Sequence, residues 1–113
     1  MKTFGQIIAA KRKELRVSQK DLAAKIKKDD GTYISAQYLN DIEHDRRNPP
    51  SEEMIKQIAG ELEIDEDYLF LIAGTFPRDM QDLGRDNPEK AKELFRAFRR
   101  ILKWYEVGRR PDW

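Results

Sequence analysis

Apolar residues recur at helical spacing through most of the chain, and in the first 74 residues they form five short stripes separated by turn or capping residues. These stripes predict helices over residues 4–15, 18–27, 35–47, 52–62 and 65–73. The residues expected to face inward are Phe4, Ile7, Ile8, Ala10 and Leu15; Leu22, Ala23 and Ile26; Leu39 and Ile42; Met54, Ile55, Ile58, Ala59 and Leu62; Tyr68, Leu69 and Ile72. The pattern therefore favours a small all-α domain.

Residues with capping preferences mark the predicted helix ends. Ser18, Ser35 and Ser51 stand where three of the helices begin, and serine hydroxyls accept hydrogen bonds from the first free backbone N–H groups. The segment Asn48-Pro49-Pro50 stops the third helix because proline lacks the amide donor and disfavours helix in the residue before it. Gly74 ends the fifth helix.

The remaining chain divides into a polar segment and one long amphipathic helix. Residues 75–87 are mixed in composition, and they are expected to form a linker. A capping asparagine and a proline at the first helical position, Asn87 and Pro88, predict a last helix that runs to about Tyr105. The expected organisation is a domain over residues 1–74, a linker over 75–87, and a helix with a short tail over 88–113.

Charge is distributed unevenly along the chain, although its sum is only +1. Residues 1–50 carry 11 Lys and Arg against 7 Asp and Glu, residues 51–87 carry 3 against 10, and residues 88–113 carry 8 against 4. A basic front half suits a polyanionic partner, and an acidic middle suits protein contacts.

Several classes of protein are disfavoured by the composition. The sequence contains no cysteine, no apolar run long enough for a membrane span and no pattern of a signal peptide, so we expect a soluble, cytoplasmic protein. It has no glycine-rich phosphate loop, and its single histidine, His44, lacks partners for catalysis or metal binding. We expect neither an enzyme nor a bound metal or cofactor.

The third predicted helix is poor in apolar residues. Only Leu39 and Ile42 are aliphatic between Ser35 and the double proline, and two arginines, Arg46 and Arg47, follow the helix. A helix that only fills a core would be more apolar. One of its sides is therefore expected to face a partner.

The first two thirds of the chain resemble a known family. Ser18-Gln19, Leu22-Ala23, Ile34-Ser35, Tyr38-Leu39, Ile42-Glu43 and Asn48-Pro49 follow in the order found in the XRE family, the lambda repressor/Cro-like helix-turn-helix domains. The resemblance spans roughly Thr3 to Gly74. It implies a five-helix DNA-binding domain of a bacterial or phage transcriptional regulator, with double-stranded DNA as its partner.

The resemblance also implies roles for individual residues. Base contacts are expected from Ala36, Gln37, Asn40 and Asp41; phosphate contacts from Ser18, Gln19, Ser35, Tyr38, Arg46, Arg47 and Asn48; and a structural ion pair from Arg12 and Glu43. The chemistry of two of these residues agrees independently, because a glutamine amide can bind adenine in a bidentate way and an alanine methyl can contact a thymine methyl.

One segment departs from the family pattern. Seven residues, KKDDGTY, lie between Ile26 and Ile34, where the family has a tight turn. The extra residues are expected to loop outward around Gly31. Lys27 and Lys28 in this loop either contact phosphate or only keep the loop soluble.

The last helix carries an apolar stripe that is expected to be covered. Its members, predicted to form a dimer interface, are Leu94, Phe95, Phe98, Ile101, Leu102 and Tyr105. Dimerisation is favoured over packing on helices four and five of the same domain, because regulators of this type bind paired half-sites. Both are favoured over membrane binding, because Glu89, Glu93 and Glu106 are unfavourable for a basic amphipathic helix on a membrane. The expected function is a repressor that binds a palindromic operator as a homodimer. The alternative is an antitoxin or mobile-element regulator whose last helix captures a toxin or a protease.

Overall fold

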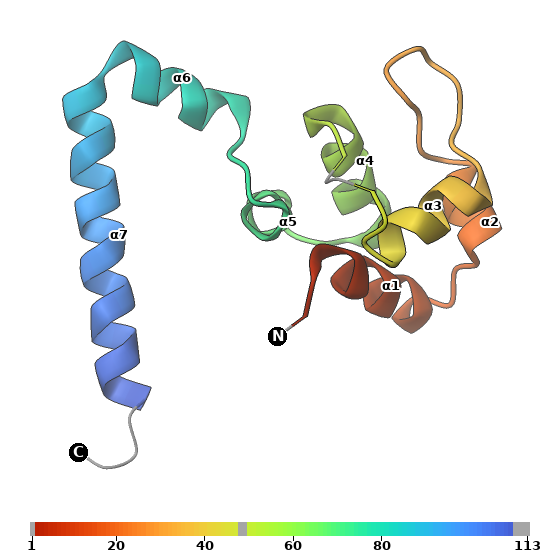
Figure 1. Ribbon diagram of the computed structural model, residues 1–113, viewed down its shortest axis with the longest axis horizontal. Helices are drawn as coiled ribbons and strands as arrows, with labels where there is room; N and C mark the ends of the chain where they lie inside the picture. Colours follow the sequence, from red (N-terminus) through yellow and green to blue (C-terminus); the bar gives the residue numbers. More distant parts are fainter. Residues whose placement is uncertain (1, 48–49, 110–113) are drawn as a thin grey trace. The chain divides into compact units, whose positions relative to one another are not determined.

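The computed structural model describes residues 2–47 and 50–109, and this part of the chain forms seven α-helices and no strand (Figure 1). The helices are α1 (Phe4–Glu14), α2 (Gln19–Ala23), α3 (Ala36–Glu43), α4 (Glu52–Leu62), α5 (Glu66–Ala73), α6 (Arg78–Asp86) and α7 (Pro88–Arg109). The chain divides into two compact units, Met1–Pro77 and Arg78–Trp113. The prediction of an all-α fold is confirmed.

Serine caps begin α2, α3 and α4, as the sequence predicted. The Oγ atoms of Ser18, Ser35 and Ser51 each accept a hydrogen bond from the backbone N–H three residues later, at 3.0, 3.0 and 3.3 Å. Asn87 caps α7 in the same way, since its Oδ1 accepts from the N–H of Lys90 at 3.1 Å. These caps satisfy donors that the first turn of a helix leaves free.

Two helices end earlier than expected. α2 stops at Ala23 rather than near Lys27. Lys27 instead pairs with Tyr33 in a hairpin. α3 stops at Glu43, five residues before the predicted stop at Asn48. Asp45 adopts a left-handed conformation with φ 57°, and its carboxylate binds the hydroxyl of Thr3 and the N–H of Gly5. The left-handed residue ends α3, and the long-range contact holds it in place. Asn48 itself lies outside the described residues.

The core of the first unit joins all five of its helices. α1 contacts α3, α4 and α5, α2 contacts α3, and α4 contacts α5. The buried apolar residues are Phe4, Ile8, Leu22, Ala23, Ile26, Ile34, Leu39, Ile42, Met54, Ile55, Ile58, Ala59, Leu62, Leu69, Phe70 and Ala73. The five inward residues predicted for α4 are all in this set. Ala10, which was expected to complete the stripe of α1, is instead exposed.

α5 presents a different face from the one predicted. Tyr68 was expected to point inward but is 46% exposed, whereas Phe70, which was not among the predicted inward residues, is only 1% exposed. α5 packs on both α4 and α1, and its buried residues are Leu69, Phe70 and Ala73. The prediction for Tyr68 is wrong because the direction of the neighbouring helices, not the local stripe, sets the buried side.

The second unit consists of α6 and α7. α6 occupies most of the range expected to be a linker, and α7 continues four residues past Tyr105. The two helices contact each other, and a Cβ atom placed on Gly84 would lie 4.0 Å from the Cβ of Ala91. α6 was not predicted, because the polar composition of residues 75–87 indicated a linker. None of the described helices combines the length and apolar character that crossing a membrane requires.

Candidate nucleic-acid interface

The outer face of α3 carries the four residues predicted to contact bases. Ala36, Gln37, Asn40 and Asp41 are spaced so that they share one side of the helix, opposite the buried Leu39. Ala36 and Gln37 in the first turn are exposed, whereas Asn40 and Asp41 are half-buried. The first turn is therefore the most accessible part of this face.

Asp41 is surrounded by donors. Its Oδ1 accepts a hydrogen bond from Nε2 of Gln37 at 3.1 Å, and its carboxylate lies 3.6 Å from the guanidinium of Arg46 and 3.8 Å from that of Arg47. Both arginines therefore fold back from the loop after α3 onto its outer face. The carboxylate neutralises part of their charge and holds the Gln37 amide.

The ring of Tyr38 lies beside two cations from different segments. The guanidinium carbon of Arg47 is 3.9 Å from the ring centroid, and Nζ of Lys28 is 5.2 Å from it. Cations are attracted to the face of an aromatic ring by its quadrupole. Tyr38 is partly buried against the core, and its ring also makes the cation–π contacts with Lys28 and Arg47.

Gln19 is committed to contacts inside the protein. Its Nε2 donates to Oδ1 of Asn40 at 3.1 Å and to Oε1 of Glu43 at 2.9 Å. An amide nitrogen has two N–H donors, so a phosphate would have to displace one of these bonds. Asn40 keeps its own amide N–H groups, which are the donors that a base acceptor needs.

Ser18 and Ser35 lie at the helix starts and are exposed. Each Oγ accepts one backbone hydrogen bond, as described above, but a hydroxyl that accepts still has its O–H to donate. Both residues can therefore cap their helices and donate to a phosphate oxygen at the same time.

A buried ion pair fixes α3 against α1. Nε and Nη2 of Arg12 donate to the two carboxylate oxygens of Glu43 at 2.6 and 3.0 Å, and Nη1 donates to the carbonyl of Val17 at 2.9 Å. Arg12 is 9% exposed and Glu43 is 5% exposed. Because Gln19 also binds Glu43, one carboxylate links α1, α2 and α3. Within the described part of the chain, no buried side-chain nitrogen or oxygen lacks a partner.

His44 and the acidic residues do not assemble a metal site in the described part of the chain. His44 is exposed, and its Nδ1 lies 2.8 Å from the backbone carbonyl of Asn40, one turn earlier. The histidine thus packs on the end of its own helix.

Residues 8–69 of the chain match a family model described as Helix-turn-helix, and this range includes α2 and α3. The chain belongs to the helix-turn-helix family. It contains a DNA-binding domain of the XRE type, and its general role is that of a transcriptional regulator. Comparisons with curated proteins and with solved structures give no match.

In the helix-turn-helix domain, α2 and α3 are the two helices of the motif, and the structure joins several of the predicted residues through Asp41. Ala36, Gln37, Asp41, Arg46 and Arg47 are connected through α3 and the loop that follows it. Asn48 lies outside the described residues. The apolar residues of α7 belong to the second unit and are described with the proposed function.

Three features of the helix-turn-helix domain were missed from the sequence. Asp45 binds the first turn of α1, as described above, and Gly5 lies so close to α3 that a Cβ would be 2.4 Å from the carbonyl oxygen of Ile42. Lys28 approaches Tyr38 from the loop between the two motif helices. The glycine in the first turn of α1 was the one local signal, because glycine there indicates a close approach of two backbones.

Proposed function

We propose that the protein is a repressor that binds a palindromic operator as a homodimer. The observation that carries this proposal is the outer face of α3, where the exposed Ala36 and Gln37 lie on the same side as Arg46 and Arg47. Side chains that can read base edges and cations that can bind phosphate are thereby combined on one surface.

The proposed docking places the first turn of α3 in the major groove. Gln37 and Asn40 then face base edges, while the arginines and the hydroxyls of Ser18 and Ser35 face the phosphates on either side. Asp41 must release Gln37, Arg46 and Arg47 during binding, because its carboxylate contacts these residues in the free protein and the DNA would bind them instead. A carboxylate can itself accept a hydrogen bond from cytosine.

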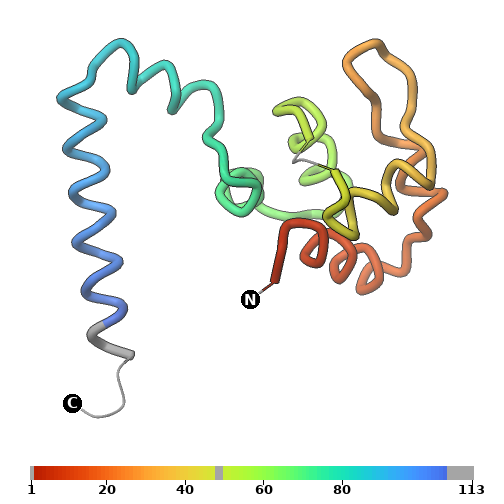
Figure 2. The backbone as a smooth tube through the Cα atoms, viewed as in Figure 1, coloured from red at the N-terminus to blue at the C-terminus, as the bar shows by residue number. Residues whose placement is uncertain are grey.

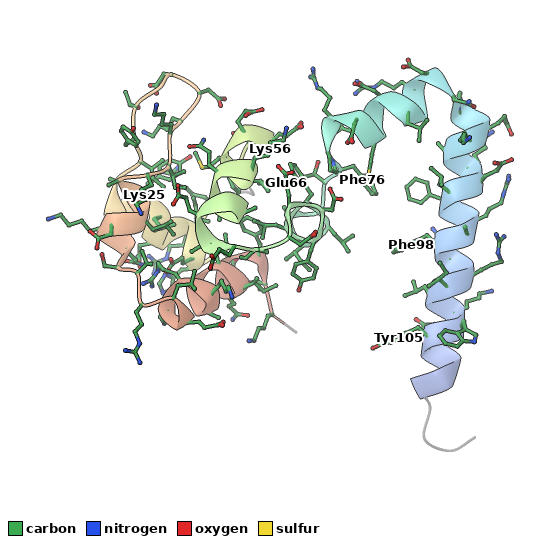
Figure 3. All side chains as sticks on the ribbon, turned by 180° about the vertical axis from the view of Figure 1, so that it is seen from behind. Lys25, Lys56, Glu66, Phe76, Phe98 and Tyr105 are labelled. Carbon is green, nitrogen blue, oxygen red and sulfur yellow. The ribbon has the colours of Figure 1, made fainter. Side chains whose placement is uncertain are left out.

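The dimer is proposed to form through α7. Its apolar residues are exposed within the single chain, at 52% for Leu94, 52% for Phe98, 66% for Ile101 and 45% for Leu102. Figure 3 shows Phe98 and Tyr105 on the same side of this helix. A second copy of the chain would cover such a stripe, and two-fold symmetry of the protein would match a palindromic site.

A selection of bound fragments from random duplex DNA tests the proposed operator. We expect an inverted repeat whose half-sites are separated by about one helical turn, roughly 10–10.5 base pairs, or a multiple of it. A single asymmetric site would contradict the homodimer, and failure to enrich any sequence would contradict sequence-specific binding. Reporter transcription from a promoter that contains the selected site then tests repression.

Point substitutions in α7 test the dimer. Ile101→Glu places a charge in the stripe and should convert a dimer to a monomer in sedimentation equilibrium. Lys103→Glu introduces the same side chain outside the predicted interface and should leave the dimer intact. The operator affinity of the Ile101→Glu protein should fall with its dimerisation.

The alternative function, capture of a toxin or a protease by α7, is favoured by one observation. α6 and α7 form a compact unit of their own, and the described part of α7 combines exposed aromatic residues, among them Trp104 at 78%, with an excess of Lys and Arg. Under this alternative, Ile101→Glu would leave the oligomeric state and DNA binding unchanged and abolish binding of the protein partner.

A further inference from the structure

The seven residues between Ile26 and Ile34 form a hairpin loop that is closed by one isolated β-bridge. Lys27 and Tyr33 make an antiparallel bridge, the N–H of Lys28 donates to the carbonyl of Thr32 at 2.8 Å, and the N–H of Ile34 donates to the carbonyl of Ile26 at 2.9 Å. Figure 2 shows the backbone leaving α2 and returning to α3 through this narrow loop. The insertion therefore has a defined backbone structure.

The base and the tip of the hairpin are both fixed. At the base, the side chain of Gln57 in α4 accepts from the N–H of Lys27 at 2.8 Å and donates to its carbonyl at 2.9 Å. At the tip, Gly31 has φ 86°, which an L-residue with a side chain rarely adopts, and Oδ1 of Asp30 accepts from the N–H and hydroxyl of Thr32. These contacts hold the hairpin in one position relative to the first unit's helices.

The two lysines of the hairpin lie beside different aromatic rings. Nζ of Lys27 lies 5.3 Å from the centroid of the Tyr33 ring, within the hairpin, whereas Nζ of Lys28 lies 5.2 Å from the ring of Tyr38 on α3. Of the two lysines, Lys28 therefore lies beside the ring that Arg47 also contacts.

We propose that Lys28 and Arg47, supported by the same Tyr38 ring, form a clamp for a phosphate group of the DNA backbone. The hairpin thus extends the DNA interface beyond the two motif helices. This inference rests on the proposed DNA-binding function. A phosphate diester carries a negative charge and several acceptor oxygens, so it can take a charge-assisted hydrogen bond from each of the two cations that lie beside this ring.

The ring contacts also lower the entropic cost of the clamp. Long cationic side chains lose rotamer freedom when they bind a ligand, and an aromatic ring restricts both before binding. The acidic tip limits the clamp to the base of the hairpin, because Asp29 and Asp30 would repel a nearby phosphate.

Salt titration of DNA binding tests the clamp, with the neighbouring lysine as its control. Affinities of the full chain for its selected operator and for an unrelated duplex are measured from low to high salt, for the wild type, Lys28→Gln and Lys27→Gln. Both variants remove one positive charge from the same hairpin. Thermal unfolding of each establishes that the fold is kept.

Loss of one phosphate contact reduces the slope of log K against log salt by about 0.9. We therefore expect Lys28→Gln to show this reduction and to weaken binding to both duplexes roughly 5- to 10-fold at 0.1 M salt, while Lys27→Gln keeps a slope close to that of the wild type. Tyr38→Leu should reduce the effect of Lys28→Gln, because the ring that orients the lysine is gone.

Equal slopes for Lys28→Gln and Lys27→Gln would overturn the clamp and leave the proposed function in place. Failure of the wild type to bind any duplex at low salt would instead overturn the proposed function itself. A reduced slope for Lys28→Gln that is unchanged in the Tyr38→Leu background would overturn the role of the shared ring.

Discussion

The guanidinium of Arg12 and the carboxylate of Glu43 form two parallel hydrogen bonds, of 2.6 and 3.0 Å, between α1 and α3. Such a pair is sensitive to the loss of one partner, because the charge that remains is buried without compensation. We expect Arg12→Met to lower the free energy of unfolding by about 3–5 kcal/mol, measured by urea denaturation.

The neighbouring residue provides the control for this substitution. Lys11 pairs with Glu14 at 3.4 Å on the surface, where Glu14 is 68% exposed. Exposed pairs contribute only about 0–1 kcal/mol, so Lys11→Met should change the stability little. Similar losses for the two variants would show that the buried pair does not hold α3 in place.

Gly5 is required by the close approach of α1 to the end of α3. An added Cβ would lie 2.4 Å from the carbonyl oxygen of Ile42 and 2.5 Å from that of Glu43. We expect Gly5→Ala to destabilise the domain by about 1–3 kcal/mol or more. Gly60→Ala is the matched control: it lies within α4 with nothing within 4 Å of its added Cβ, and it should stabilise by up to about 1 kcal/mol. Thermal unfolding of both variants measures these changes in stability.

Gln37 and Arg46 should affect DNA binding in different ways. Gln37→Ala removes a candidate base contact and should reduce discrimination at one base position by about 1–3 kcal/mol. Arg46→Ala removes a candidate phosphate contact and should weaken binding to all sequences alike and flatten its salt dependence. Affinities for a set of single-base operator variants measure both effects. Unchanged relative affinities in Gln37→Ala would refute base reading by this residue.

Asp41 should restrain non-specific binding. Its carboxylate lies within 4 Å of both Arg46 and Arg47, so it offsets charge that would otherwise attract phosphates. Asp41→Asn keeps the shape and the Oδ1 acceptor for Gln37 but removes the charge. We expect affinity for unrelated duplex DNA to rise roughly 3- to 10-fold at low salt, by fluorescence anisotropy. Asp21→Asn, on α2, makes the same chemical change without an arginine partner in the described contacts and should have a smaller effect.

The tip of the hairpin should respond to pH through Asp30. The hydrogen bond from the Thr32 hydroxyl, with a second one from its backbone N–H, stabilises the carboxylate and lowers the pKa of Asp30. Because the folded-state pKa is lowered, this contribution to stability is complete above the ordinary pKa of an aspartate and is lost as the pH falls through the lowered value. Thr32→Val should raise the pKa of Asp30 toward its ordinary range in a carboxyl NMR titration. Thr32→Ser keeps the hydroxyl and should keep the pKa low.

Local signals in the sequence predicted most of the fold. The caps at Ser18, Ser35 and Ser51 act over three residues, and the buried stripe of α4 follows the helical period, so both were readable from the sequence. The side of α5 that is buried depends on α1 and α4, which are distant in sequence, and Phe70 therefore replaced Tyr68 in the core. The hydrogen bond between Asp45 and Gly5 spans 40 residues and has no local signature.

For the candidate site, the positions of the residues on α3 were predictable from the sequence, but the contacts among their side chains were not. Helical spacing was enough to place Gln37 and Asp41 on one face of α3, and the resemblance to the XRE family implied their role. Their mutual hydrogen bond, and the return of Arg46 and Arg47 to Asp41, depend on the path of the loop after α3. The hairpin was expected only as an outward loop, because its order comes from Gln57 in another helix.

Gln19 connects the start of α2 to Asn40 on α3 through a single amide group. Any displacement of that amide by a DNA strand would free an acceptor on α3 and change what Asn40 can offer. The width of the DNA groove sets how closely a DNA strand approaches Gln19. Groove width would therefore influence the affinity of the protein for sites whose contacted bases are identical. Operators should consequently be distinguished partly by the flexibility of base steps that no side chain touches.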